Sequence, residues 1–541
     1  MKKAKKIIAL VLTIVMIMLT VAVPASAASK VDPSESTSAK IEATLYQILD
    51  KLVFYLGKVL NMLIPGLNLG SRWQNFDDYQ SPDGFYAGET SFDTTVYDNA
   101  QWSAGYAYAS LLEGLDIFDG SYYMAGTLEV MEGRVPTKVI DDQGVSVYAV
   151  SDGVSGIAVQ AVLDGYGFAR GDVLQIRNRL KDFAAENNII SINISVLHQH
   201  SCIDILGMGA PLVPAIFKNP ALSLIGADLD QYVGGKSVQF MNNLYDVVAG
   251  AVMTAVNDME TGTLYYGSVD ASELMYDKRQ PITFDGELHR FRFDPDNEES
   301  NEIWLCEAGI HCVGFGAGAD VISADFPYYF KQYAKETTGA DVVYVQGAEL
   351  AITTDHTYVN TDSSDDVVRT KAYGEVLAKK AMSIDNEVEL DPVLNVTFKE
   401  VAIETDNQIL TLVVREGLIN SVITKAGLGY NIITEIGYME LGNKVGVVFI
   451  PGEIAPELIW GGVVGADKSW TNDTWDYASM AETAGVEKLL CFGLNNDQIG
   501  YILADNDIHS MFTENEEINA SSTTSGSALT KAFEALIAEV K

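Results

Sequence analysis

Hydrophobic positions along the chain follow two spacings, which predict a mixture of helices and strands. Near the N-terminus a spacing of three and four residues runs through nine positions, namely Ile41, Leu45, Ile48, Leu49, Leu52, Leu56, Val59, Leu60 and Leu63. This spacing places side chains on one face of a helix, and Pro65-Gly66 predicts its end. The segment lacks the basic excess of helices that lie on membranes, so we expect its apolar face to pack on the protein's own core.

From residue 105 to residue 508, short β-branched runs alternate with helical segments. The predicted strands are 145–150, 189–196, 303–312, 341–345, 393–398, 409–414 and 444–450. The predicted helices are 171–186, 238–257 and 328–338. Residues 514–527 are polar, which predicts a linker to a last helix at 528–540. The fold class is therefore α/β (mixed α+β), in one large body.

The first 27 residues have the pattern of an export signal. Four lysines within residues 1–6 precede an apolar run at 7–23, and Ala25-Ser26-Ala27 is a small-residue cleavage site. We therefore expect a secreted protein after cleavage. The alternative is a retained membrane anchor, because the apolar run is near the lower length limit for a span.

Composition excludes several classes of function. The chain has 35 Lys and Arg against 74 Asp and Glu, a net charge of −39, so we expect no nucleic-acid partner. The same charge disfavours anionic membranes, so any transient membrane-surface contact must depend on apolar side chains. Four cysteines, Cys202, Cys306, Cys312 and Cys491, lack a zinc-binding spacing. Export would allow disulfides, but buried thiols are the stronger expectation.

The candidate chemistry gathers at predicted strand ends, where α/β enzymes place reactive groups. His198 and His200 continue one face of the strand at 189–196, so they could share a metal or divide ligand and proton-transfer roles. His311 and Glu453 follow two other apolar runs. Spacing alone leaves alternatives open: the first two histidines could be an ordinary pair, His311 a core residue and Glu453 part of a solvated turn.

Several motifs in order resemble the neutral/alkaline non-lysosomal ceramidase family, specifically its N-terminal catalytic domain. The matching segments lie between about residues 105 and 505. They are Tyr122–Gly126, Ser151–Gly153, Ser195–Ser201 (like THTHSG), Lys278-Arg279, Ala308–Cys312, Ser323–Pro327 (like SADFP), Pro451–Glu453 (like PGE) and Asn496–Tyr501. The residue patterns predict a signal peptide at 1–27, an amphipathic helical segment at 28–70, and a polar linker with a terminal helix at 514–541. The resemblance implies a ceramidase-like catalytic domain at 71–513, a large layered domain whose central mixed β-sheets are flanked by helices.

The same resemblance implies a zinc site. Its metal ligands would be His198, His311, Glu453 and Tyr501. Zn²⁺ would activate a water and polarise a scissile carbonyl. The resemblance gives catalytic roles to His200 and Arg279, which would stabilise developing charge or handle a proton. Asp204 is a candidate for orienting an imidazole, from its nearness in sequence alone.

Two departures from the family pattern limit what the resemblance implies. The stretch at 345–351 contains no serine, so a serine nucleophile has no candidate there, and Glu349 is an additional acid. The 40 residues after Tyr501 are too few for the family's C-terminal immunoglobulin-like domain. We expect an exported zinc amidohydrolase acting on an N-acyl lipid or another amide. The alternatives are a metal-dependent hydrolase of another amide or ester, and a non-catalytic secreted binding protein; the oligomeric state is not predicted.

Overall fold

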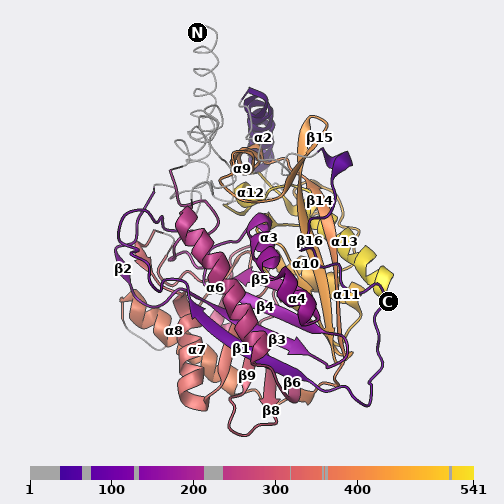
Figure 1. Ribbon diagram of the computed structural model, residues 1–541. Coiled ribbons are helices and arrows are strands. Elements are labelled where there is room, and N and C mark those ends of the chain that lie inside the picture. Colours follow the sequence, from indigo (N-terminus) through magenta and orange to yellow (C-terminus); the bar gives the residue numbers. More distant parts are fainter. Residues whose placement is uncertain are drawn as a thin grey trace.

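The computed structural model describes residues 37–63, 75–126, 133–211, 236–316, 318–355, 359, 363–510 and 515–541. The predicted export signal at 1–27 and the Pro65-Gly66 helix end lie outside these ranges. Within them, helices flank several mixed sheets, so the predicted α/β class is confirmed (Figure 1). In the part of the chain described, we find no helix whose length and hydropathy would let it cross a membrane.

The larger sheet has nine strands. Their path is β11 (Asp341–Gln346), β9 (Ile303–Ala308), β8 (Glu287–Pro295), β6 (Glu260–Asp270), β1 (Ser103–Ser110), β3 (Gly144–Ser151), β4 (Ile157–Leu163) and β5 (Ile189–Val196), with β13 (Val388–Glu389) beside β6. The pairs β4–β5 and β11–β9 are parallel, and the other pairs are antiparallel. The chain leaves β5 and β9 through long connections rather than tight hairpins, and these connections carry His198 and His311.

The smaller sheet packs against the larger one. Its strands are β14 (Leu394–Glu404), β16 (Gly429–Leu441), β17 (Val445–Phe449) and β19 (Lys488–Phe492), with β15 (Ile423–Ala426) paired to β16. Phe449 and Phe492 share one apolar core with Phe291 and Leu305 of the larger sheet. Three two-stranded pairs complete the strands: β2 (Lys138–Val139) with β10 (Val321–Ile322), β7 (Met275–Asp277) with β12 (Ile352–Thr354), and β18 (Glu453–Ile454) with β20 (Tyr501–Ile502).

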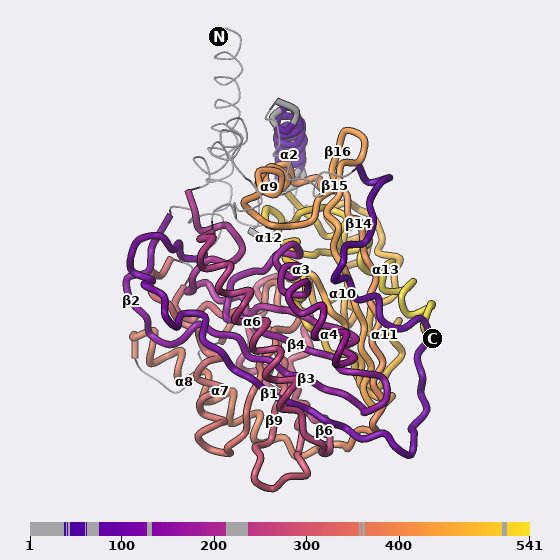
Figure 2. The backbone as a smooth tube through the Cα atoms, viewed as in Figure 1, coloured from indigo at the N-terminus to yellow at the C-terminus, as the bar shows by residue number. Residues whose placement is uncertain are grey.

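Helices cover the outer faces of this pair of sheets (Figures 1 and 2). On the larger sheet, α6 (Val238–Asn257) packs on β1 and β3, and α3 (Arg170–Arg179) packs on α6. On the other side, α7 (Asp325–Thr338) packs on β11 and on α8 (Asp366–Met382). On the smaller sheet, α13 (Ser525–Val540) packs on β14 and β16. Shorter helices are α4 (Lys181–Glu186), α10 (Pro456–Trp460), α11 (Met480–Ala484) and α12 (Asn515–Asn519), and single 3₁₀ turns lie at Phe76–Asp78, Ser272–Leu274 and Asp505–Asp507.

Most predicted elements agree with the structure, and one is wrong. β5 and α6 have the predicted bounds, whereas the helix at 171–186 is divided at Leu180 into α3 and α4. The strand predicted at 409–414 is instead a helix, α9 (Gln408–Arg415). Its β-branched composition favours a strand, but the Asn407 side chain accepts from the backbone N–H groups of Ile409 and Leu410 and so caps a helix.

Two further predictions depend on composition, one for the cysteines and one for the segment at 514–527. All four cysteines are buried and free, as the preference for buried thiols predicted. The segment at 514–527, expected to be a polar linker, contains α12 and buries Ser521, Ser522 and Ser525. Its hydroxyl groups are satisfied locally, as in the bond from Ser525 to the Ser522 carbonyl, so the polar composition does not keep this segment in solvent.

The predicted N-terminal helix is present as α2 (Thr37–Leu63), but the expectation that its apolar face packs on the core is wrong. Ile41, Leu45, Ile48 and other residues of that face are exposed. The helix instead contacts α9 through a different face. Spacing identified the helix correctly, but it could not show which face the rest of the chain would cover.

Candidate metal centre

Three loops that follow three strands bring the candidate ligands together. His198 comes two residues after β5, His311 three residues after β9, and Glu453 four residues after β17. The first two strands belong to the larger sheet and the third to the smaller sheet. The site therefore lies where the carboxyl ends of strands from both sheets meet, and all three side chains are buried.

The loops that carry the two histidines are fixed by backbone geometry and by one amide. His198 has a φ of 58°, a left-handed conformation that non-glycine residues seldom adopt and that turns the chain sharply after β5. Gln346, at the end of β11, donates to the carbonyls of Leu197 at 3.2 Å and Ile310 at 2.7 Å. It also accepts from the Ile310 N–H at 3.0 Å. This single side chain ties the His198 loop to the His311 loop.

Two imidazole nitrogens converge on one carboxylate oxygen. Glu453 Oε2 lies 3.2 Å from His198 Nε2 and 3.3 Å from His311 Nε2. The other oxygen, Oε1, accepts from Gln498 Nε2 at 2.9 Å, which orients the carboxylate. Zinc bonds of about 2.0–2.1 Å in a tetrahedral site place neighbouring ligand atoms roughly 3.3 Å apart, so the distance from the carboxylate oxygen to each imidazole nitrogen matches that between zinc ligands.

The remaining ring nitrogens have partners that fix the orientation of both imidazoles. His198 Nδ1 lies 2.7 Å from the Tyr166 carbonyl, and His311 Nδ1 lies 2.9 Å from the Glu349 carbonyl. The Glu349 carboxylate is also 2.6 Å from His311 Nδ1. When each Nδ1 donates its proton to these oxygens, each Nε2 presents a lone pair toward Glu453, which is the arrangement that metal-binding histidines adopt.

The three histidines of the site differ in protonation. Burial lowers the pKa of His198 to about 4, although Glu453 acts in the opposite direction. Burial, with His198 and His311 nearby, lowers the pKa of His200 well below its usual value. Burial alone would also lower the pKa of His311, but the carboxylates of Glu349 and Glu453 outweigh it and raise this pKa to about 10. A proton on His311 thus supplies positive charge between two carboxylates, and a metal ion bound at this ring would have to displace it.

His200 and Tyr501 lie at the edge of this centre. The His200 ring is 4.7 Å from that of His198 between centroids, and neither of its nitrogens has a hydrogen-bond partner among the described residues. Together His198, His200 and His311 form one group able to hold a metal ion, and His311, Glu349 and Glu453 form another. Tyr501 is the register partner of Glu453 in the parallel pair β18–β20 and lines the same small cavity.

Two other predicted residues have different surroundings. The Arg279 guanidinium lies 3.0 Å from Glu517 and 3.4 Å from Asp507, and it donates to the Asp507 carbonyl at 2.8 Å. Asp204 does not orient an imidazole. Its carboxylate instead accepts from the backbone N–H groups of Leu206, Gly207 and Gly209, so it shapes its own loop.

Replacing Arg279 by alanine is therefore expected to reduce stability strongly. The change leaves two buried carboxylates without their shared cation, which typically costs about 3–5 kcal/mol of unfolding free energy. Urea unfolding monitored by fluorescence measures the loss. Exposed Arg369→Ala serves as a control and should change stability by less than about 1 kcal/mol. An arginine that served only substrate chemistry would give the opposite result, with activity reduced and unfolding free energy unchanged.

Sequence reasoning missed several residues that support the site. The sequence marks Glu349 only as an additional acid, and it gives no sign that Tyr166, Gln346 and Gln498 belong to the site. Tyr166 stacks on His198 with ring centroids 4.6 Å apart and meets His200 edge-on at 4.9 Å. Each acts through contacts across 32 to 149 positions of the sequence, and no local motif signals such a contact.

Comparisons with known proteins relate this fold to ceramidases. The structure of neutral ceramidase from Pseudomonas aeruginosa matches with a TM-score of 0.59 and 14% identity, covering 81% of this chain and 74% of that chain. A ceramidase complexed with C2 matches with a TM-score of 0.59 and 13% identity, covering 81% of this chain and 75% of that chain. A scan against protein-family models and a search of curated proteins gave no match. The likeness establishes a ceramidase-like fold.

Proposed function

We propose that the protein is a zinc-dependent amidohydrolase that cleaves the amide bond of an N-acyl lipid, within the ceramidase family that its motifs resemble. The observation that carries this proposal is the convergence of His198 Nε2 and His311 Nε2 on Glu453 Oε2 at 3.2 and 3.3 Å. These donors, with Tyr501 beside Glu453, fit Zn²⁺ in number and chemical type. The ceramidase-like fold supports the choice of an amide substrate.

The proposed roles of the residues follow from their positions. His198, His311, Glu453 and Tyr501 would hold the ion, which supplies Lewis-acid polarisation of a carbonyl and activation of water. His200 is buried, uncharged at neutral pH and without a hydrogen-bond partner among the described residues, so its ring is available to donate to a developing oxyanion or to transfer a proton. Arg279, held by Asp507 and Glu517, would act by maintaining the nearby structure.

An apolar cavity beside the candidate ligands supports a substrate with a hydrocarbon chain. It adjoins Glu453 and Tyr501, and most of its other walls are aliphatic, formed by Leu206, Met208, Leu410, Val414, Ile419, Ile432 and Ile499. The cavity measures about 50 Å³, far below the roughly 300–1,000 Å³ of ligand pockets. An acyl chain would enter only if these walls move apart, and such movement would expose aliphatic rather than charged surface.

Metal analysis and substrate hydrolysis test this function together. The purified chain is expected to hold about one zinc ion and to release fatty acid from ceramide in mixed micelles, with activity lost on chelation and restored by zinc. Short N-acyl amides and esters, assayed in parallel, distinguish a lipid amidase from a hydrolase of soluble substrates. Zinc binding without hydrolysis of any of them would favour the binding-protein alternative, and failure to bind zinc would reject the proposal.

A further inference from the structure

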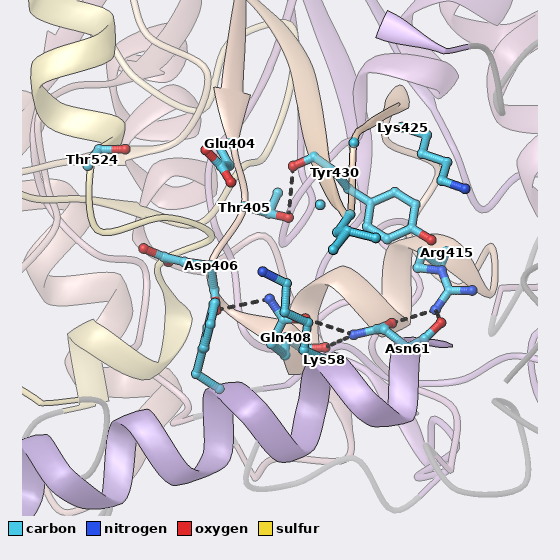
Figure 3. A pocket seen from close by; sticks show the side chains of 14 residues that line it. Lys58, Asn61, Glu404, Thr405, Asp406, Gln408, Arg415, Lys425, Tyr430 and Thr524 are labelled. Carbon is cyan, nitrogen blue, oxygen red and sulfur yellow. Dashed lines mark hydrogen bonds between the residues drawn. The ribbon is translucent and has the colours of Figure 1, made fainter. Parts of the chain in front are cut away.

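α2 is attached to the rest of the protein by the face that carries Val53, Gly57 and Asn61, all three of which are buried. Gly57 lies so close to α9 that a Cβ there would collide with Gln408. Asn61 donates to the carbonyl and to Oε1 of Gln408, both at 3.2 Å, and its Oδ1 accepts from Arg415 at 2.7 Å (Figure 3). These contacts attach the helix by a narrow face and leave its longer apolar row outside the contact.

The other side of α2 carries an uninterrupted apolar stripe. Its members recur every four and three residues and are 38% to 65% exposed: Ile41, Leu45, Ile48, Leu52, Tyr55 and Val59. At 1.5 Å per residue the stripe is about 27 Å long. Single exposed apolar residues are common on proteins, but a contiguous row of this length marks an interaction surface.

The tip of the β15–β16 hairpin extends the same surface. Leu428, at this tip, is 82% exposed. A cavity of about 520 Å³ lies between the hairpin and α2, with Phe54 and Lys58 on one side and Lys425 and Leu428 on the other. Figure 1 shows that α2 and the hairpin project from the same end of the molecule. We call the α2 stripe together with Leu428 the docking end.

Charge at the docking end differs from charge on the rest of the chain. α2 contains three lysines and two acids, and its net charge of +1 is too small a basic excess to hold it on a membrane alone, but it spares this end the repulsion that the −39 of the whole chain would meet at an anionic surface. Lys51 and Lys58 directly precede Leu52 and Val59, so they lie along one edge of the stripe. Lysines in this position cover apolar surface with their methylene stems and place their ammonium groups at the level of lipid headgroups.

A second copy of the chain fits this stripe less well. The six residues occupy the a and d positions of a heptad, which puts Lys51 and Lys58 at g. An antiparallel pair would set g against g, lysine against lysine. A parallel pair would set the two lysines against e positions occupied by Leu56 and Leu63, which offer no acid. A phospholipid surface, in contrast, accepts both the apolar row and its basic edge.

We infer that the docking end binds the surface of a phospholipid membrane, with α2 lying in the plane of the headgroups and Leu428 inserted beside it. The inference goes beyond the proposed hydrolase activity and does not depend on it. α9 connects the two regions, because it contacts α2 and its Leu410 and Val414 line the cavity next to Glu453. A docked protein would therefore hold its candidate metal centre one helix away from the lipid.

Vesicle flotation tests the inference. The chain is prepared in full and from Ala28 onward, which omits the apolar run at 7–23 and retains every described residue. The chain from Ala28 is expected to float with phosphatidylcholine vesicles. The triple variant Leu45→Gln/Ile48→Gln/Leu52→Gln should bind at least about tenfold more weakly. A matched triple of exposed apolar residues elsewhere, Phe118→Gln/Met253→Gln/Val388→Gln, should bind like the parent.

Two further variants separate the contributions to binding. Lys51→Gln/Lys58→Gln should weaken binding to vesicles that contain phosphatidylglycerol by roughly fivefold per lysine and leave binding to phosphatidylcholine unchanged. Leu428→Asp tests the hairpin independently of α2 and should also weaken binding. The inference is overturned if the chain from Ala28 does not float, or if the α2 triple variant floats equally well with its melting temperature unchanged. If the parent chain forms a dimer but does not bind vesicles, and the triple variant is monomeric, the stripe is instead an interface with a second copy.

Discussion

His198→Ala is expected to abolish zinc binding and to lower the rate of hydrolysis by more than about 100-fold. Replacing a residue that only hydrogen-bonds to a metal ligand costs up to about 100-fold, so loss of a ligand itself should cost more. The variant removes one of the two nitrogens that meet Glu453 Oε2 and leaves one imidazole, one carboxylate and the Tyr501 hydroxyl, a set with a single nitrogen donor in place of two. Folding should persist, because the His198 loop is held separately by Gln346. Elemental analysis and hydrolysis rates, measured on the same preparation, check the prediction.

His289→Ala provides the matched control, because His289 is also buried and paired with a carboxylate. Its Nε2 lies 2.5 Å from Asp285, within a group of Asp285, Glu287 and His289 that could itself hold a metal ion. Lys488 lies 3.1 Å from Asp285 and 2.6 Å from Glu287, so this group already has a cation. The control should retain zinc. Equal zinc loss in both variants, or retained zinc and activity in His198→Ala, would contradict the assignment of the metal centre.

Spacing placed each candidate residue after a recognisable strand, and the motif resemblance joined these residues into one predicted centre. β5 is buried at every position except Ile190, and the strands before His311 and Glu453 are short and apolar, so period and composition located all three strand ends. What local pattern could not provide was the meeting of two sheets. The approach of Glu453 to the histidines depends on packing between residues more than 140 positions apart.

Where the sequence misled, residues outside the segment decided its structure. Residues 409–414 read as a strand, but the Asn407 cap and burial between α2 and the core favour a helix. α2 itself was correctly recognised from its spacing. The choice of its buried face was wrong because Gly57 and Asn61 match the shape and hydrogen bonds of α9, whereas Ile41, Leu45, Ile48 and Leu52 remain exposed.

Glu349 links the missed residues to the chemistry of the centre. Its carboxylate and its carbonyl both contact His311 Nδ1, so it fixes the ring and supplies negative charge behind the ligand. The family pattern has a serine-containing stretch at this point of the sequence. In this chain a carboxylate that positions His311 lies in the corresponding stretch. Its negative charge makes His311 Nε2 more basic, and so a stronger ligand for a metal ion.

Glu349→Gln is expected to weaken zinc binding by about 10- to 100-fold near pH 9, because the amide still accepts the Nδ1 proton but carries no charge. The difference in zinc affinity between the parent and Glu349→Gln should shrink as pH falls. In the parent, Glu349 and Glu453 raise the pKa of His311 to about 10, so zinc must displace a proton and its affinity falls about tenfold per pH unit below that value. The variant lowers this pKa, so its zinc affinity should depend less on pH.

Competition with a chromophoric chelator, repeated from pH 9 downward, measures both the zinc affinity and its dependence on pH. Glu307→Gln is the control, because Glu307 is equally buried, lies on β9 ahead of His311 and faces His289 at 3.8 Å instead. It should preserve the pH slope of the parent. A purely structural role for Glu349 would change the unfolding free energy and leave that slope intact, whereas a positioning role changes the slope even where stability is unaltered. The slope therefore decides whether this acid acts through His311.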